Sequence, residues 1–139
     1  MVLARIGEPS DEAWLLNHTE QHKQNWVAMG VAHQRYVIAQ IDGQAVGYLR
    51  FSLLWGHIPF MEEVWVEPDS RGEGAGRTMV GFWEDWMKAD GALTLVTSAE
   101  EHAALAQKWH QANGYRPAGR LGLGLAQADD ELYFIKDLH

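Results

Sequence analysis

Three glycines at alternate positions, Gly72, Gly74 and Gly76, lie between an apolar, β-branched segment and a helical pattern. Residues 60–66 before the loop predict a strand, and apolar residues at helical spacing after it predict a helix over residues 76–90. Glycine permits positive φ angles and a close approach of the backbone to a ligand. A strand, a glycine loop and a helix in this order predict an anion site, formed by main-chain N–H groups at the helix N-terminus. The alternative is a flexible turn that binds nothing.

Two well-known phosphate-binding loops do not match this segment. A P-loop needs a Gly-Lys pair, and the chain contains none. The dinucleotide-binding loop needs G-x-G-x-x-G, whereas the third glycine here comes one position too early. That loop also normally opens the first βα unit of a domain, and these glycines lie at mid-chain. The segment therefore needs another interpretation.

A third pattern fits, namely Arg71-x-x-Gly74-x-Gly76, preceded by the strand end VWV and the turn EPDS. This pattern resembles motif A of the GNAT superfamily of acetyltransferases. The segment EEHAALAQKWHQANGY is similar to the family's second motif, and its matching residues are Ala106, Trp109, Gly114 and Tyr115. The segments WGHIPFMEEVWV, RTMVGFWEDWMK, VTSAEE and ELYFIKDL are similar to small bacterial GNAT proteins whose acceptors are mostly unassigned. The resemblance extends from about residue 35 to the C-terminus.

The pattern of strands and helices is compatible with the fold that this resemblance implies. Periodicity predicts strands over residues 2–6, 36–41, 45–54, 59–66, 93–97, 121–125 and 132–135, and helices over 9–31 (with a break), 76–90 and 100–113. The pair Asp42-Gly43 predicts a hairpin, and Gly114 predicts the end of the last helix. We expect a single α/β (α+β) domain over residues 1–139, with a mixed, mostly antiparallel sheet of about six to seven strands flanked by helices. The resemblance implies that strands four and five of this sheet are splayed apart.

The resemblance also implies that acetyl-CoA is the cosubstrate. Its pyrophosphate would be held by main-chain N–H groups of residues 72–77, with Arg71 and Arg77 as charge partners. Its pantetheine arm would pair with main-chain groups of Val64 and Val66 on the fourth strand. The cofactor-binding residues implied in this way are Val64, Trp65, Val66, Arg71, Gly72, Glu73, Gly74, Ala75, Gly76 and Arg77.

Direct attack of an acceptor amine on the thioester, in a ternary complex, is the mechanism that the resemblance implies. The family often has a tyrosine four residues before the glycine of its second motif, and this tyrosine protonates the departing thiolate. This chain has His110 at that position, as a candidate proton donor or, alternatively, as a residue of the helix surface. The family's base is a carboxylate of the fourth strand. Alternation sends Glu62 and Glu63 to opposite faces, and we expect Glu62 to face the cleft unless a β-bulge reverses the choice.

The segment LLWGHIPF joins two predicted strands near the place where the family's acceptor enters. It is apolar without helical spacing. We therefore expect Trp55, His57 and Phe60 to line an acceptor pocket, and the alternative is a packed connection between strands.

Composition argues against several other classes of function. The 139-residue chain has a formal net charge of −8, which argues against a nucleic-acid-binding face. It has no cysteine and hence no thiolate metal site. His18 and His22 have the i, i+4 spacing of metal ligands, but no third ligand lies near them in the sequence, so we expect no metal. No apolar run has membrane-spanning length and no signal peptide is evident, so we expect a cytoplasmic protein without a membrane partner.

The function predicted from these observations is acetyl-CoA-dependent N-acetylation of a primary amine, on a small molecule or a protein. One alternative is a non-catalytic acyl-CoA-binding sensor or interaction module, which the missing tyrosine and Ala103 in place of the second motif's asparagine favour. A transferase of a longer acyl group is another alternative. Many GNAT proteins pair through a sheet edge, so a homodimer is an alternative to a monomer.

Overall fold

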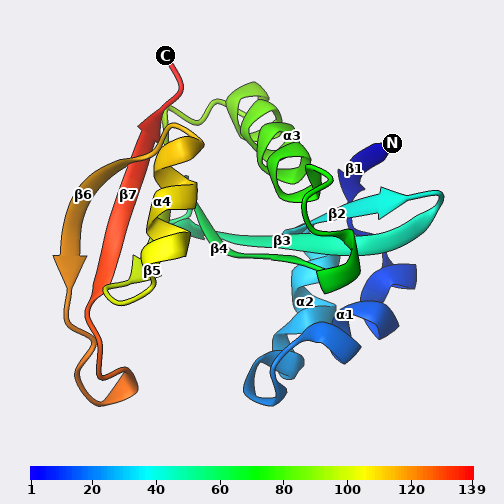
Figure 1. Ribbon diagram of the computed structural model, residues 1–139, viewed down its shortest axis with the longest axis horizontal. Helices are drawn as coiled ribbons and strands as arrows, with labels where there is room; N and C mark the ends of the chain where they lie inside the picture. Colours follow the sequence, from blue (N-terminus) through cyan, green and yellow to red (C-terminus); the bar gives the residue numbers. More distant parts are fainter.

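The sheet of this protein continues from the first half of the chain into the second half through one parallel strand pair (Figure 1). The computed structural model describes residues 1–139, apart from the side chain of His22. Its described residues form a seven-stranded sheet in the order β1-β2-β3-β4-β5-β7-β6, in which the β4–β5 pair is parallel and the other pairs are antiparallel. The strands are β1 (Val2–Ile6), β2 (Tyr36–Ile41), β3 (Gln44–Leu54), β4 (Ile58–Val66), β5 (Thr94–Glu100), β6 (Arg116–Leu121) and β7 (Glu131–Asp137).

Helices cover both faces of the β1–β4 half of the sheet (Figure 1). They are α1 (Glu12–His18), α2 (Val27–Ala32), α3 (Ala75–Ala89) and α4 (Ala104–Ala112), with 3-10 helices at Pro9–Asp11, Gln21–Trp26, Pro68–Ser70 and Gly124–Ala126. α1 and α2 pack on one face of this half, α3 packs on the other, and α4 packs beside β5. Within the described residues, no helix combines the length and the apolar character needed to cross a membrane.

Each face of the β1–β4 half has its own hydrophobic core. On one face, α3 buries an apolar stripe at helical spacing, and this stripe contains Met79, Val80, Trp83 and Met87. On the other face, a smaller cluster joins α1 and α2 to the sheet, and its buried members are Leu15, Val27, Val31, Tyr36, Ile38 and Tyr48. These two cores fix the position of β4, which lies at the inner edge of this half.

β4 and β5 separate soon after they meet. The described residues of the two strands pair at two positions, Phe60 with Val96 and Met61 with Thr97. The buried Thr97 hydroxyl donates a hydrogen bond of 3.0 Å to the Met61 carbonyl at this point. Beyond it, β4 continues beside β3 to Val66, whereas β5 pairs with β7. The expected splay between strands four and five is therefore confirmed, and one edge of β4 borders the gap.

Most predicted elements are present with shifted ends. The break in the first helical region is the 3-10 helix Gln21–Trp26. The predicted hairpin joins β2 to β3, with positive φ angles of 50° at Asp42 and 79° at Gly43. β5 continues to Glu100, so α4 begins at Ala104, later than predicted.

The prediction of a strand over residues 121–125 is wrong. The strand that pairs with β7 here is β6, which ends at Leu121, and residues 124–126 form a 3-10 helix. β6 is an edge strand with every residue exposed, so Pro117 and Gly119 are tolerated where a central strand would exclude them. Two of the three leucines that suggested a strand, Leu121 and Leu125, are exposed instead.

Two glycines, one on β3 and one on α3, give opposite expectations for substitution by alanine. A Cβ at Gly47 on β3 would lie 2.8 Å from the Trp65 carbonyl oxygen, so Gly47→Ala should lower the free energy of unfolding by about 1–3 kcal/mol. A Cβ at Gly81, on the exposed side of α3, meets nothing within 4 Å. Gly81→Ala should therefore raise the free energy of unfolding by about 0.5–1 kcal/mol through helix propensity. Urea denaturation of both variants checks this pair, and equal effects would contradict the packing described for β3 and β4.

Candidate active site

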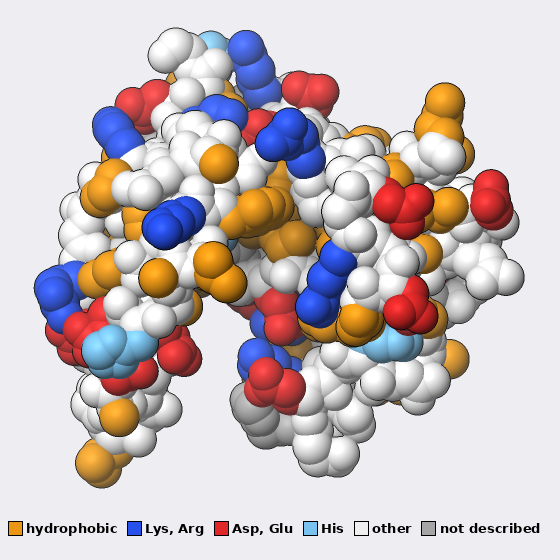
Figure 2. Space-filling model, in the orientation of Figure 1, with side chains coloured by type: hydrophobic (Ala, Val, Ile, Leu, Met, Phe, Trp, Pro, Cys, Tyr) orange, Lys and Arg blue, Asp and Glu red, His pale blue; other side chains and the backbone are white. Residues whose placement is uncertain are grey.

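A cleft of about 1000 Å³ opens where β4 and β5 separate, and Figure 2 shows the hollow between the two halves of the molecule. Its walls are the end of β4, the loop before α3 with the first turn of that helix, the middle of β5 and one side of α4. The lining residues include every predicted cofactor-binding residue except Glu73, which is exposed beside the cleft. The fold thus brings the β4 and loop segments of the prediction together around one cavity.

The glycine loop lines this cleft together with the first turn of α3. Gly72 and Gly74 have positive φ angles of 87° and 85°, which explains glycine at both positions. Gly74 is the N-cap of α3, and no side chain of the described residues caps this helix end. The N–H groups of the first turn have no acceptor within a helix. They carry the positive end of the helix dipole, so this end of the cleft favours an anion.

Glycine at the third position, Gly76, is explained by packing. A Cβ at this position would lie 3.1 Å from the Trp109 ring, which belongs to α4 on the other side of the cleft. Gly76 therefore allows α3 to approach α4 closely.

The two arginines beside the loop differ in their contacts. Arg71 donates from Nε to the Val66 carbonyl at 2.9 Å, whereas Arg77 is exposed, and no carboxylate of the described residues lies within ion-pair distance of it.

A β-bulge at Glu62 determines where the two glutamates of β4 point. Arg50 of β3 pairs with Glu63 and Phe51 pairs with Met61, so Glu62 is an extra residue on its strand. The expectation that Glu62 and Glu63 occupy opposite faces is wrong. Arg50 donates from Nε to Glu62 at 2.9 Å and from an η nitrogen to Glu63 at 3.1 Å, so both carboxylates contact one guanidinium.

The two carboxylates nevertheless differ in what surrounds them. Glu63 also accepts a hydrogen bond of 2.9 Å from the Tyr48 hydroxyl. Burial and the neighbouring Glu63 carboxylate raise the pKa of Tyr48, so this phenol remains a donor. Both glutamates line the main cleft, but Glu62 is the more exposed of the pair and also lines a smaller pocket on its other side. Glu62 is thus placed where a molecule in the pocket can reach the cleft.

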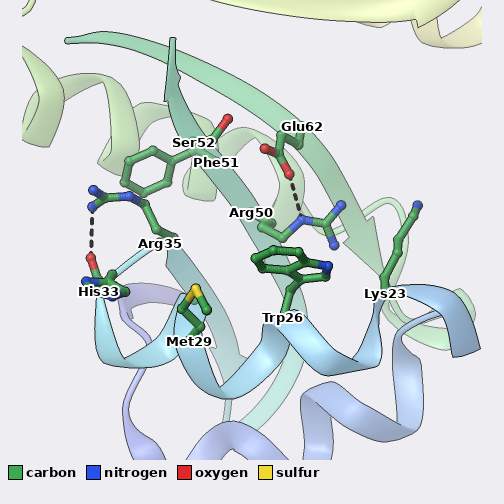
Figure 3. Close-up of a pocket in the computed structure, with 10 residues that line it drawn as sticks. Lys23, Trp26, Met29, His33, Arg35, Arg50, Phe51, Ser52 and Glu62 are labelled. Atoms are coloured by element: carbon green, nitrogen blue, oxygen red, sulfur yellow. Dashed lines mark hydrogen bonds and ion pairs between the residues drawn. The ribbon is translucent and has the colours of Figure 1, made fainter. Parts of the chain in front are cut away.

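The smaller pocket has a volume of about 490 Å³ and was not predicted from the sequence (Figure 3). It lies between the Gln21–Trp26 and α2 segment on one side and strands β3 and β4 on the other. Its lining residues are Lys23, Trp26, Met29, Gly30, His33, Arg35, Arg50, Phe51, Ser52 and Glu62. The one local signal for it is Arg50, a charged residue within the apolar strand segment YLRFSLL.

His110 lies on the wall of the main cleft with its ring buried, so its alternative placement on the helix surface is wrong. Its Nε2 lies 3.1 Å from the Ser98 carbonyl oxygen of β5. A carbonyl only accepts hydrogen bonds, so Nε2 carries the proton and Nδ1 is a bare acceptor. Nδ1 is buried and has no partner among the described residues. Burial lowers the pKa of His110, so the ring is neutral at pH 7.

The three residues predicted for an acceptor pocket do not join this site. Trp55 is 85 % exposed on the turn between β3 and β4, and His57 lines a separate pocket beside the end of α3. Phe60 packs against the Tyr133 ring of β7. The turn lies at the end of β4 opposite to the glycine loop, so the fold gives no support to the prediction for these residues.

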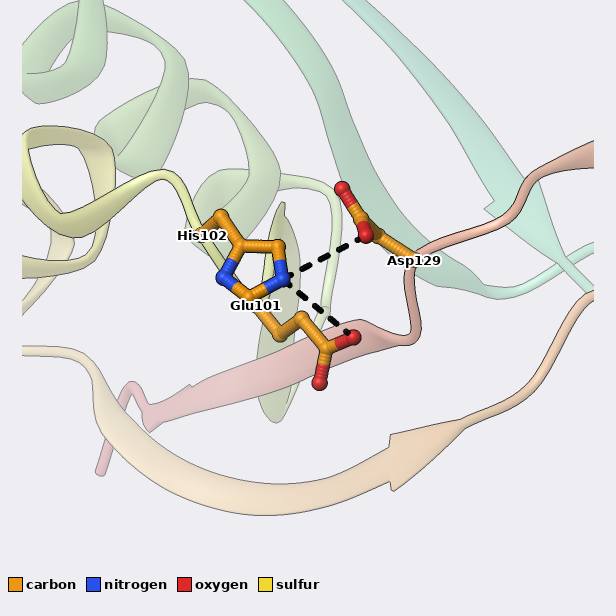
Figure 4. A group of neighbouring side chains, drawn as sticks. All are labelled: Glu101, His102 and Asp129. Carbon is orange, nitrogen blue, oxygen red and sulfur yellow. Dashed lines mark ion pairs between the residues drawn. The ribbon is translucent and has the colours of Figure 1, made fainter.

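Two groups of histidines and acids are held by contacts within the protein. His18 bonds the Trp14 carbonyl and the Glu67 carboxylate, and the side chain of His22 lies outside the described residues. Glu101, His102 and Asp129 lie close together on the surface (Figure 4). The Glu101 carboxylate already accepts hydrogen bonds from Arg120 and from a main-chain N–H, so we assign no metal to this group.

Comparison with known proteins identifies relatives of the whole fold. The family model described as "Acetyltransferase (GNAT) family" matches residues 4–115. A GNAT-family acetyltransferase from Bacillus cereus has a TM-score of 0.80 at 18% identity, covering 99% of this chain and 97% of that chain. The ribosomal-protein-S18-alanine N-acetyltransferase from Escherichia coli has a TM-score of 0.82 at 16% identity, covering 99% and 94%. A Salmonella typhimurium protein described as a candidate acetyltransferase, solved with acetyl-CoA, has a TM-score of 0.75 at 20% identity, covering 99% and 94%. No curated protein sequence matches this chain.

The buried His110 ring should make stability depend on pH. Its folded-state pKa is lowered, so the unfolded chain gains a proton first as the pH falls below about 6.5. The free energy of unfolding should therefore decrease over this range, and the decrease should be smaller in His110→Phe. Urea denaturation of both proteins at about pH 7.5 and pH 5.5 measures the difference. Equal losses in the two proteins would contradict a neutral, buried His110.

Proposed function

Because this chain belongs to the acetyltransferase (GNAT) family, we propose that it transfers the acetyl group of acetyl-CoA to a primary amine of a small molecule or a protein. The observation that carries the proposal is the uncapped N-terminus of α3, which opens into the cleft between the splayed strands β4 and β5. The Salmonella typhimurium structure, solved with acetyl-CoA, supports the cosubstrate. The Escherichia coli neighbour, an alanine N-acetyltransferase of a ribosomal protein, supports an amine acceptor.

The residues of the cleft fit acetyl-CoA. A Cβ atom added to Gly72 or Gly74 would have no neighbour within 4 Å. This open space suits close contact between main-chain N–H groups and a pyrophosphate. Arg77 adds an exposed guanidinium in the same turn of α3. The free edge of β4 near Val64 and Val66 suits the amide-rich pantetheine arm, because an extended chain can pair with a strand edge.

In the proposed reaction, acetyl-CoA supplies a thioester carbonyl carbon that a neutral amine attacks and a thiolate that leaves. Glu62 takes a proton from the substrate ammonium, because its carboxylate lies at the junction of the pocket and the cleft. Arg50 holds this carboxylate in place through the 2.9 Å bond from Nε. The substrate ammonium loses two protons overall, of which one passes through Glu62 to solvent and the other ends on the CoA thiol. The pocket also accelerates the reaction by holding the amine in the orientation needed for attack.

His110 is the proposed donor of the proton that ends on the thiol. Donation from this ring requires a proton on Nδ1, since Nε2 donates to Ser98. Burial lowers the pKa of His110 and opposes the doubly protonated ring. A non-catalytic acyl-CoA sensor is the second candidate function. The lowered pKa of His110 favours it, because a neutral ring has no proton on Nδ1 to donate. Transfer of a longer acyl group, a cytoplasmic location and a homodimer stay predictions.

Thiol release from acetyl-CoA, across a panel of primary amines, tests the proposed function. Wild type should release CoA, and Glu62→Gln should lower kcat by roughly 100-fold without weakening the binding of acetyl-CoA, because only the base is lost. Glu63→Gln is the matched control, since this residue bonds Tyr48 and Arg50 and should keep most of kcat. Binding of acetyl-CoA without release from any amine would replace catalysis by sensing.

His110→Phe separates proton donation from packing in the same assay. It should lower kcat by roughly 10- to 100-fold while calorimetry shows unchanged binding of acetyl-CoA. Undiminished release would mean that His110 only links α4 to β5 through the Ser98 carbonyl.

A further inference from the structure

The pocket beside Glu62 exposes two large apolar side chains. Trp26 is 62 % exposed and Met29 is 50 % exposed, and both point from the α2 side toward β3 (Figure 3). On the opposite wall, β3 contributes Arg50 and Ser52, because the Phe51 ring is buried against α3. Large apolar groups exposed beside a cavity are typical of a surface that contacts a ligand with an apolar body. A flat, aromatic body matches the exposed indole of Trp26 best.

The charges in this pocket restrict its ligand further. Lys23, Arg35 and Arg50 are cationic, whereas Glu62 is the carboxylate among the described lining residues. Arg50 is neutralised by its two glutamates, but the Arg35 guanidinium lies over the Phe51 ring at 5.6 Å and donates to the His33 carbonyl, which carries no charge. Lys23 pairs with Glu20 at 3.5 Å outside the pocket lining. Arg35 is therefore the lining cation whose charge is not offset by a carboxylate in these contacts, and it disfavours a second positive charge on a ligand.

The position of Glu62 connects this pocket with the acetyl-transfer site. Its carboxylate lines both the pocket and the main cleft, so an amine bound to it faces the gap between β4 and β5. The rest of such a molecule would lie against the exposed side chains of Trp26 and Met29 (Figure 3). A volume of about 490 Å³ is in the range of pockets for small molecules.

We propose that this pocket is the acceptor site and selects a small primary monoamine carried on an uncharged aromatic body. This inference rests on the proposed acetyl transfer and names the class of its acceptor. The ammonium group binds at Glu62, the aromatic body packs against Trp26 and Met29, and Arg35 disfavours a second positive charge.

Two matched pairs of amines test the preference through thiol release. 2-Phenylethylamine should have a kcat/KM about tenfold or more above that of ethylamine, because the phenyl ring adds apolar contact. n-Butylamine should have a kcat/KM on the order of tenfold above that of 1,4-diaminobutane, which differs by a second positive charge. Equal values within either pair, or the reverse order, would overturn the proposal. A peptide with N-terminal Phe that exceeds 2-phenylethylamine would also overturn it, in favour of a protein acceptor.

Two exposed tryptophans locate the site. Trp26→Ala should raise KM for 2-phenylethylamine about tenfold with little change for ethylamine, since only the aromatic contact is lost. Trp55→Ala tests the competing placement on the β3–β4 turn, and it should leave both values unchanged. A higher KM for 2-phenylethylamine in Trp55→Ala, together with wild-type kinetics in Trp26→Ala, would overturn the assignment of this pocket.

Calorimetric titration with 2-phenylethylamine, in the presence of saturating CoA, separates this inference from the proposed function. Binding to wild type that Trp26→Ala weakens supports the pocket assignment even if no amine releases thiol, in which case acetyl transfer alone fails. Thiol release from other amines without binding of 2-phenylethylamine would overturn the inference and leave acetyl transfer standing.

Discussion

The short parallel contact between β4 and β5 is the constraint on which the site depends. Two residue pairs and the hydrogen bond from Thr97 to the Met61 carbonyl join the halves of the sheet, and the strands then diverge. β4 remains fixed to β3 and to α3, while β5 follows β7. A longer parallel pairing would close the cleft. The separation leaves a strand edge, the N-terminus of α3 and the wall of α4 facing one cavity.

The bulge at Glu62 places one residue on the lining of both this cavity and the smaller pocket. With regular alternation, one glutamate would have faced each side of the sheet. The extra residue instead brings Glu62 and Glu63 to Arg50, and a carboxylate results at the junction of the cleft and the smaller pocket. A charged group held by one arginine at such a junction can accept a proton from a ligand on either side. The chemistry proposed for this family member thus depends on a one-residue irregularity in β4.

The sequence predicted those parts of the site that depend on local conformation. The loop at Gly72 and Gly74 requires positive φ angles, and the stripe that includes Trp83 fixes the buried face of α3, so both can be recognised from spacing. Contacts between distant segments could not be predicted in this way. The bulge depends on the register between β3 and β4, and the pocket depends on how the Gln21–Trp26 segment and α2 lie against β3. The edge strand β6 was misplaced because exposure removes the apolar alternation that marks a buried strand.

Hydrogen exchange of the main-chain amides, with and without acetyl-CoA, tests the account most directly. The N–H groups of residues 72–77 and the free edge of β4 form the proposed contact surface for the cosubstrate. Acetyl-CoA should slow exchange in these two segments and leave the distant turn between β3 and β4 unchanged. Binding of acetyl-CoA that leaves exchange in the glycine loop unchanged, or no binding at all, would contradict the assignment of this cleft.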